Sequence, residues 1–377
     1  MFNIIKRRST HASKLERWIG ADQVEQMAAQ VRHWYGPPIA VAGVPGAVYA
    51  RGGGDFVGPI AAGKFGSLAD LQFERMKRIM REMSLEARLV SGVGFTSLSD
   101  MISKWTQDNK GQTLLMVKPT SVTGVTGRAN TTWYSSGTPV AGAAGAAAPG
   151  GTANAKGDTG SYPIINTTTG SEGLFLVSGF AQASTSPQSI LLYDRLFSCA
   201  KTMSSSASEA VTGVPVRYTS TTSTDWNYAG GNFIAPEVTS ALSATAHNWT
   251  VMQYTNQAGV TASIAPSVAG VSSAAANSID LPAGYWFMPL ASNDIGVTAL
   301  TQMQCSAAAL TGDINWVVGH PLAMMPCLAN YVYSPQDFTN SAFGLTRMYD
   351  TACLAYFLIG TSATGGTSGV SINVLAG

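Results

Sequence analysis

The segment 58–64, GPIAAGK, is the part of the chain that comes nearest to a nucleotide-binding motif. A phosphate-binding loop requires glycines that leave backbone N–H groups free to contact phosphate, a lysine, and a serine or threonine hydroxyl for magnesium. Phe65 stands where that hydroxyl is required, and Pro59 removes one of the N–H groups. The sequence therefore does not predict nucleotide hydrolysis.

The histidines are too few and too scattered to indicate a metal site by their spacing. They are His11, His33, His247 and His320. Neither a Gly-x-Ser-x-Gly nucleophile elbow nor a His-Glu-x-x-His zinc motif occurs in the chain. His320 lies in the apolar sequence VVGHPL, and we expect it to be a hydrogen-bonded structural histidine.

Carboxylates are scarce in residues 111–377, where only 11 occur. A general acid and a general base can come from distant positions, so the sequence leaves their pairing open. Asp194 and Asp350 each follow a tyrosine, and we expect them to cap turns or to pair with Arg195 and Arg347. We predict no catalytic residue, no metal and no cofactor, and hence a protein that is not an enzyme.

Several aromatic residues stand in or beside predicted strands, among them Trp226, Tyr228, Trp249 and Trp286. Exposed rings of this kind stack on sugars in lectins, and buried ones fill cores. We favour core filling because of their position beside the strands. Sugar binding stays as an alternative.

Charged residues make up only 11% of the chain, against about 25% in an average soluble domain. Residues 1–110 hold 15 lysines and arginines against 10 acids, a net charge of +5, whereas residues 111–377 hold 7 against 11, a net charge of −4. Two chemically different regions therefore meet near residue 110. We infer that neighbouring subunits cover much of the surface, because it carries little charge of its own.

Basic residues gather near the N-terminus. They are Lys6, Arg7, Arg8, Lys14 and Arg17. Such a group can contact nucleic acid through phosphate charges. Acids are interleaved from Glu16 onward, so we favour a solvated or subunit-contacting face over nucleic-acid contact.

The cysteines predict buried free thiols, because their spacing shows no pairs. They are Cys199, Cys305, Cys327 and Cys353. The basic start MFNIIKRR is not followed by an apolar segment, so we predict no signal peptide. We also reject the most apolar stretch, 316–333, as a membrane span, because it contains Pro321 and Pro326.

The first region, 1–110, is predicted to be helical with an extended arm. The helices cover 13–36, 67–92 and 97–107, and the arm covers 37–66. Ser13 and Glu16 have the spacing of a capping box, and Pro37 and Pro38 prevent the first helix from continuing. The arm lacks any sustained period and is interrupted by glycine and proline, which is typical of a segment wrapped around a neighbour.

The second region, 111–377, shows the period of strands with turn residues between them. The predicted strands are 113–118, 131–135, 173–183, 189–192, 214–220, 248–254, 260–264, 285–289, 296–306, 314–319, 331–333, 344–348, 353–359 and 370–375. Many short strands with almost no helix predict a mainly β fold, a β-sandwich domain of jelly-roll type.

Four tracts carry a resemblance to a known class of protein. They are SPQSILLYDRLF, SSASEAVTGVPVRYTSTTS, VVGHPLAMMPC and TRMYDTACLAYFLIG. Set in a region rich in glycine, alanine, serine and threonine, they resemble virion structural proteins of tailed bacteriophages, over roughly residues 110–377. The resemblance implies a homo-oligomeric, trimeric subunit of a capsid or of its decoration, without catalytic residues, in a virion assembled in the host cytoplasm.

Two versions of this function compete. In the favoured one, the chain is a decoration or cement subunit that binds capsid shell proteins through its N-terminal region. In the other, it is the major capsid protein, since a helix, an extended loop and a long helix resemble the tailed-phage capsid fold. The few helices expected after residue 110 favour decoration. A carbohydrate-binding receptor or tail protein is the third hypothesis.

The expected subunit contacts come from the arm and from the apolar stripe of the helix 67–92. The predicted interface residues are Tyr35, Pro37, Pro38, Phe56, Leu71, Met76, Ile79 and Met83. Apolar residues at helical spacing on one side of a helix fit a buried contact.

Overall fold

The computed structural model describes residues 39–40, 48–49, 94–122, 127–165, 168–185, 188–264, 267–291, 293–307, 311–339, 345–360 and 366–377. The chain divides into two compact units, Met1–Glu82 and Met83–Gly377. In the first unit, β1 (Ile39–Ala40) and β2 (Val48–Tyr49) pair antiparallel within the segment predicted as an arm. The predicted helices 13–36 and 67–92 lie outside the described residues. The domain boundary near residue 110 stays a prediction.

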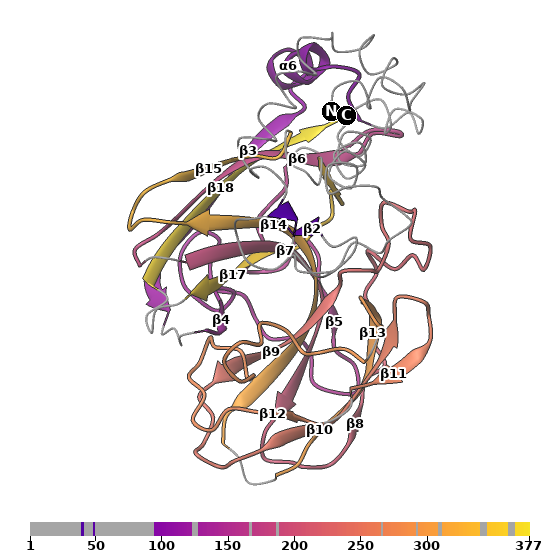
Figure 1. Cartoon of the computed structure of the whole chain (residues 1–377), viewed down its shortest axis with the longest axis vertical. Coiled ribbons are helices and arrows are strands. Elements are labelled where there is room, and N and C mark those ends of the chain that lie inside the picture. The colour runs from indigo at the N-terminus through magenta and orange to yellow at the C-terminus, as the bar shows by residue number, and fades with distance from the viewer. Residues whose placement is uncertain are drawn as a thin grey trace. The chain divides into compact units, whose positions relative to one another are not determined.

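The second unit is mainly β, which confirms this part of the prediction, and its strands pair antiparallel in three sheets (Figure 1). The first sheet, here the α6 sheet, has the order β15-β6-β18-β3 with β16 also on β6. Its strands are β3 (Gly111–Val122), β6 (Leu174–Ala183), β15 (Ser334–Asp337), β16 (Thr346–Met348) and β18 (Gly366–Ala376).

The central sheet has the order β4-β17-β7-β14-β9, with β5 also on β7. Its strands are β4 (Ala129–Thr131), β5 (Thr152–Ala153), β7 (Gln188–Thr202), β9 (Phe233–Ser240), β14 (Asp313–Cys327) and β17 (Leu354–Gly360). The third sheet has the order β11-β10-β13-β8, with β12 also on β10. Its strands are β8 (Glu209–Ala210), β10 (Asn248–Asn256), β11 (Thr261–Ser263), β12 (Val268–Ala269) and β13 (Val297–Cys305).

The two longest strands, β7 and β14, run well beyond the segments predicted for them. Each has 15 residues, and they pair along their whole length. The prediction for β14 stopped at Gly319 because Pro321 and Pro326 follow. In the structure β9 pairs only with the stretch of β14 up to Gly319, and beyond it the strand is paired with β7 alone among the described residues. A strand that is free on one edge tolerates proline, which lacks the N–H donor.

Four predicted strands are wrong or almost wholly wrong, since the predicted strand 131–135 shares only Thr131 with β4 and continues as a turn. Residues 214–220 and 285–289 form turns and irregular chain, and 331–333 lead into β15. Conversely, β9 was not predicted, because Pro236 lies in its middle. β9 is the edge strand of the central sheet, which is where proline is accepted within sheets.

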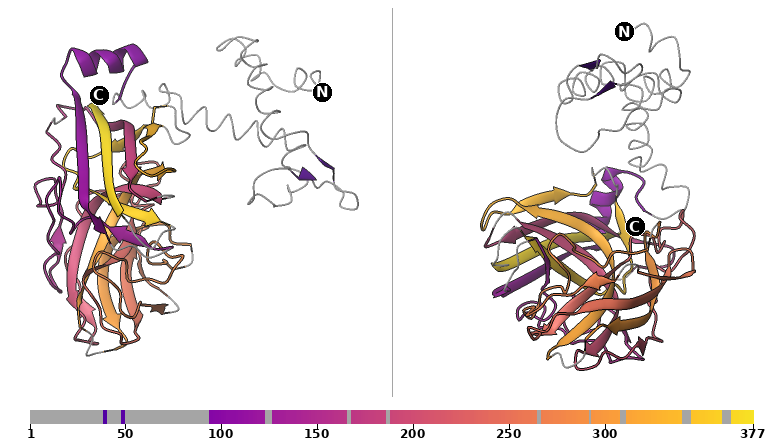
Figure 2. Two further views of the ribbon diagram at one scale, coloured as in Figure 1. Left: turned by 90° about the vertical axis from the view of Figure 1, so that its left-hand side faces the viewer. Right: turned by 60° about the horizontal axis from the view of Figure 1, so that its bottom comes forward.

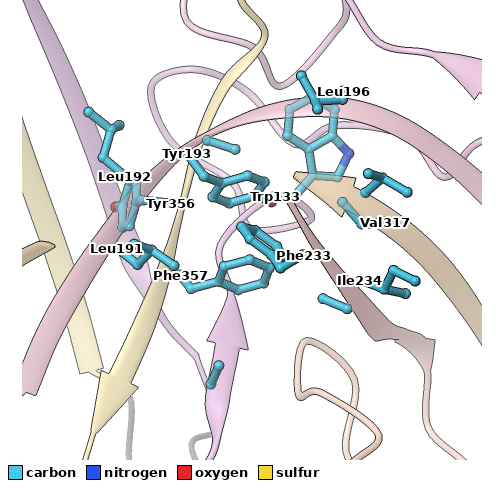
Figure 3. Close-up of a cluster of buried hydrophobic side chains, with 14 of the residues drawn as sticks. Trp133, Leu191, Leu192, Tyr193, Leu196, Phe233, Ile234, Val317, Tyr356 and Phe357 are labelled. Atoms are coloured by element: carbon cyan, nitrogen blue, oxygen red, sulfur yellow. The ribbon is translucent and has the colours of Figure 1, made fainter. Parts of the chain in front are cut away.

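The core lies where the other two sheets pack against the central sheet. On one side Trp249 of β10 meets Trp316 of β14 edge to face, with ring centroids 4.5 Å apart. On the other, the hydroxyl groups of Tyr356 in β17 and Ser368 in β18 are hydrogen-bonded at 2.9 Å. Figure 3 shows a cluster of buried aromatic and aliphatic side chains from the central sheet and Trp133. Aromatic pairs of this kind add about 0.5–1.5 kcal/mol each beyond the burial of their area.

Helix α6 (Leu98–Thr106) confirms the predicted helix 97–107. It begins where the hydroxyl of Ser97 accepts the N–H of Asp100 at 3.1 Å, a typical N-cap. Met101 is its buried residue and packs in a small cluster with Phe95 and Phe175, so the helix covers one end of the outer face of the α6 sheet (Figure 2). No helix within the described ranges is long and apolar enough to cross a bilayer.

Candidate functional site

None of the residues predicted from the sequence to form the subunit interface falls in the described part of the chain. They are Tyr35, Pro37, Pro38, Phe56, Leu71, Met76, Ile79 and Met83. The segment 58–64, His11 and His33 also lie outside it. The candidate site therefore consists of residues of the second unit.

The charges of β7 are buried in ion pairs. Arg195 donates from Nη2 to Oε2 of Glu237 at 2.8 Å and from Nη1 to Oε1 at 3.0 Å, and both side chains are fully buried. Tyr134 donates its hydroxyl to the same carboxylate at 3.0 Å, and the guanidinium lies 4.5 Å above the ring of Trp133. Burial alone would lower the pKa of Arg195, but Glu237 outweighs it and raises that pKa. The guanidinium of Arg195 is therefore held in its charged form.

Asp194 pairs with Arg217, so the expected pairing of Asp194 with Arg195 is wrong. Arg217 donates from Nε to Oδ2 at 2.8 Å and from Nη2 to Oδ1 at 2.7 Å, and the backbone N–H of Cys353 donates to Oδ1 at 2.8 Å. Successive residues of a strand point to opposite faces of the sheet, so neighbours such as Asp194 and Arg195 find different partners. Burial raises the pKa of Asp194 in spite of Arg217.

A third buried group joins His247, Trp249 and Asp280. His247 Nε2 lies 2.9 Å from Oδ2 of Asp280, Trp249 Nε1 donates to the same oxygen at 2.8 Å, and the N–H of Val271 donates to Oδ1 at 2.6 Å. A histidine oriented by a carboxylate is part of many catalytic triads. Here the side chains of His247 and Asp280 are fully buried, so a substrate has no access to them. We infer that the group fixes the chain around Val271, and Trp249 is a core residue as predicted.

His320 is a hydrogen-bonded structural histidine, as predicted. Its Nδ1 lies 2.8 Å from Oδ1 of Asn232. Its ring stacks on Tyr218 with centroids 3.7 Å apart and planes 7° apart. Burial lowers the pKa of His320 to about 4.

A pH dependence of stability follows from His320. The unfolded chain takes up this proton below pH about 6.5, whereas the folded chain resists it down to about 4. The unfolded state therefore binds more protons in this window, and the contribution of His320 to stability is lost as the pH falls through it. We expect the stability difference between the wild type and His320→Gln to shrink from pH 7 to pH 4, measured by urea unfolding. A difference that stays constant over this range would contradict the burial of a neutral imidazole.

The cysteines are free and buried, as predicted. They are Cys199, Cys305, Cys327 and Cys353. Burial raises the pKa of the Cys353 thiol to about 12. Among the described residues, no group of three or more histidine, cysteine, aspartate or glutamate side chains is placed to hold a metal ion.

The surface of residues 111–377 carries few fully exposed charged side chains. Of its seven basic side chains, four are buried, namely Lys118, Arg195, Lys201 and Arg217, and three are half-buried, namely Arg128, Lys156 and Arg347. Among its acids only Asp225 and Asp337 are exposed. An ordinary soluble surface is about 25–35% charged. Of the 18 charged side chains in this region, seven are buried, nine are half-buried and two are exposed.

Large apolar side chains are exposed on α6. Leu98 and Ile102 are 64% and 55% exposed, and Trp105 continues their stripe one turn further while its ring packs on Gly111. The outward stripe of a nine-residue amphipathic helix is thus left without a partner in the described structure.

The same outer face of the sheet exposes further apolar side chains, beyond a row of hydrogen-bonded polar residues formed by Thr113, Asn373 and Ser178. Leu115 of β3, Ser371 of β18 and Phe180 of β6 stand side by side in register, and Leu115 and Phe180 are exposed. Directly opposed residues of paired strands point to the same face. Leu98, Ile102, Trp105, Leu115 and Phe180 are called the α6 face below. No sequence signal showed in advance which side of α6 would point outward.

A second exposed group surrounds Trp226. The guanidinium of Arg347 lies 4.1 Å above the Trp226 ring, and the ring of Tyr349 lies 4.6 Å away from it. The expected pairing of Asp350 with Arg347 is wrong, because Asp350 accepts a hydrogen bond from Thr168 at 3.2 Å. Trp226 is 41% exposed.

Comparison with protein families, curated proteins and solved structures found no match to this chain.

Proposed function

We propose that this chain is a structural protein of a bacteriophage virion, a decoration or cement subunit that stabilises the shell by binding capsid proteins and further copies of itself as a trimer. The observation that carries the proposal is the α6 face, a set of exposed apolar side chains on a unit with few fully exposed charges. Exposed apolar patches on soluble proteins are typical of protein contacts. Burial in a contact stabilises it by about 25 cal/mol per Å² of apolar surface.

We propose four further features of this chain, namely its sandwich type, its attachment to the shell, its lack of enzymatic activity and its location. The β domain is a sandwich of jelly-roll type, and the N-terminal region with its arm attaches the subunit to the shell. The protein has no enzymatic role, takes no cofactor and is located in the virion, assembled in the host cytoplasm. The major capsid protein is the alternative within the same class, and direct nucleic-acid contact is disfavoured. The buried ion pairs support a structural role, because the side chains that form them serve the fold.

A carbohydrate-binding receptor or tail protein is the second candidate. Trp226 and Trp286 are exposed, as a sugar-stacking site requires. A glycan screen with the purified chain separates the two functions. Selective binding of one sugar that Trp226→Ala abolishes would favour the receptor, and a cement subunit shows no such selectivity.

Removing apolar area from α6 should weaken self-association. We expect the double variant Leu98→Ser with Ile102→Ser to lower the association constant about 10-fold or more, because two exposed side chains lose their burial in the contact. Sedimentation velocity over a range of concentrations measures the effect. Val214→Ser with Val216→Ser is the matched control, since both valines are exposed and lie outside the α6 face.

The control variant should associate as the wild type does, and both variants should keep the wild-type melting temperature. Equal association of the wild type and the α6 variant would remove the α6 face from the proposal.

A further inference from the structure

Residues 141–151, AGAAGAAAPGG, form a strap on the central sheet that consists almost wholly of glycine and alanine. The N–H of Gly145 donates to Oδ1 of Asn315 in β14 at 3.0 Å. Directly after it, the carbonyl of Ala146 accepts the N–H of Ala200 in β7 at 3.1 Å. Side chains this small bury little apolar area, so polar contacts have to hold the strap on the sheet.

Two side chains of the central sheet beside the strap have a polar atom without a partner. Oγ of Ser198 in β7 and Nδ2 of Asn315 in β14 make no hydrogen bond with the described residues, and both side chains are fully buried. Burying a polar group without a hydrogen bond costs free energy, and native proteins leave few such groups unpaired. These two atoms therefore indicate a partner that is not a protein group.

The two residues are diagonal neighbours on one face of the sheet. Ser198 lies opposite Val317 in the pairing of β7 with β14. Asn315 lies opposite Ala200, two residues further along β7. Opposed residues of paired strands point to the same face, and so do residues two apart in a strand. Gly145 lies beside both, because it binds Asn315 and a Cβ built on it would be 2.6 Å from Ser198 Oγ.

The strap fixes which atom of the Asn315 amide stays without a partner. The N–H of Gly145 needs an acceptor, so the amide oxygen faces the strap and Nδ2 cannot take its place. Nδ2 is a donor, and the hydroxyl of Ser198 can both donate and accept. One small molecule that accepts from Nδ2 and donates to Oγ would therefore satisfy both groups.

The charges on this face favour a neutral molecule over an ion. Glu237 lies opposite Asn315 in β9, and its carboxylate is already bound by Arg195. The ion pair leaves no net charge to attract a further ion, and burying an unpaired ion is costly. Buried water commonly bridges polar groups that the protein leaves unpaired. We propose that a buried water molecule bridges Asn315 Nδ2 and Ser198 Oγ and helps to hold the strap on the central sheet. This inference does not depend on the proposed function.

A double-mutant cycle, measured by urea unfolding of the full-length chain, tests the water bridge. Ser198→Ala should lower the equilibrium constant of folding about 5-fold, because the water loses one of its partners. In the background of Asn315→Ala the same substitution should have little effect, because the other partner is already gone.

Thr301→Val is the matched control. Oγ1 of Thr301 in β13 is also buried without a partner, but none of the described residues paired with β13 carries a second such atom. A water bridge is therefore not expected there, and Thr301→Val should not weaken folding.

The outcomes decide between a water bridge and a hydroxyl without one. If Ser198→Ala folds as well as the wild type or better, the bridge is overturned, because removing an unpaired buried hydroxyl is not destabilising. An equal loss with and without Asn315→Ala would overturn it too, since the hydroxyl would then act independently of the amide. A crystal structure of the full-length chain provides a second test that needs no variant. A water within hydrogen-bonding distance of both atoms would support the proposal, and ordered side chains without that water would overturn it.

Discussion

Replacing Glu237 by alanine should lower the free energy of unfolding by about 3–5 kcal/mol, because it leaves a buried guanidinium without its acid. Arg195 cannot reach water, since both members of the pair are fully buried. The hydroxyl of Tyr134 loses the acceptor of its hydrogen bond at the same time. Urea unfolding followed by tryptophan fluorescence measures the loss.

Two further variants isolate the cause of this loss. Glu172→Ala breaks the ion pair with Lys110, whose side chains are partly exposed, and should cost less than about 1 kcal/mol. Arg195→Met combined with Glu237→Leu removes both buried charges and should be more stable than Glu237→Ala alone. A loss in Glu237→Ala no larger than in Glu172→Ala would show that Arg195 is not sealed from water.

The second large effect is expected at the pair of tryptophans between the central and third sheets. Trp249 donates its indole N–H to the buried carboxylate of Asp280 at 2.8 Å, whereas the indole N–H of Trp316 has no partner among the described residues. Trp249→Phe and Trp316→Phe remove similar volume from the same contact. We expect Trp249→Phe to be the more destabilising by about 1.5–3 kcal/mol, the contribution of a hydrogen bond to a charged group.

The same unfolding experiment measures both variants, and the difference between them isolates the hydrogen bond from the loss of volume. Equal destabilisation would mean that Asp280 finds a replacement donor. His247 is the candidate, since it already lies 2.9 Å from the same oxygen.

The sequence predicts that the second unit is mainly β and that it contains the short helix α6. Alternation of apolar and polar residues revealed β6, β10, β13 and β18, and the capping residue Ser97 marked the start of α6. These signals are local. The strands and the helix form where the signals predict them because tertiary packing favours the same elements.

Prediction of strands from the sequence was wrong where charged residues and prolines lie within strands. β7 was expected to end before Asp194 and Arg195, because a strand buried on both faces normally excludes ionised groups. The structure accepts them because Arg217 and Glu237 supply opposite charges from positions 23 and 42 residues away along the chain. The partners of these charges are close in space but far apart in the sequence. The spacing of residues therefore does not predict the ion pairs.

The candidate site was predicted only in outline. Low charge content indicated a surface covered by neighbours, but the residues named for the contact lie outside the described part of the chain. The α6 face could not be predicted, because Leu115 and Phe180 come to lie on either side of Ser371 only when β3, β18 and β6 pair. The orientation of α6 depends on Met101 being the residue that packs inward.

Sedimentation velocity of the wild-type full-length chain, over a wide range of concentration and at two salt concentrations, is the most direct test of the account. Apolar contact predicts a reversible, concentration-dependent assembly, trimeric at the plateau, that persists when salt screens charge. A particle that sediments as a monomer at every concentration, and stays in solution, would contradict the claim that this weakly charged exterior exists to be buried against other subunits.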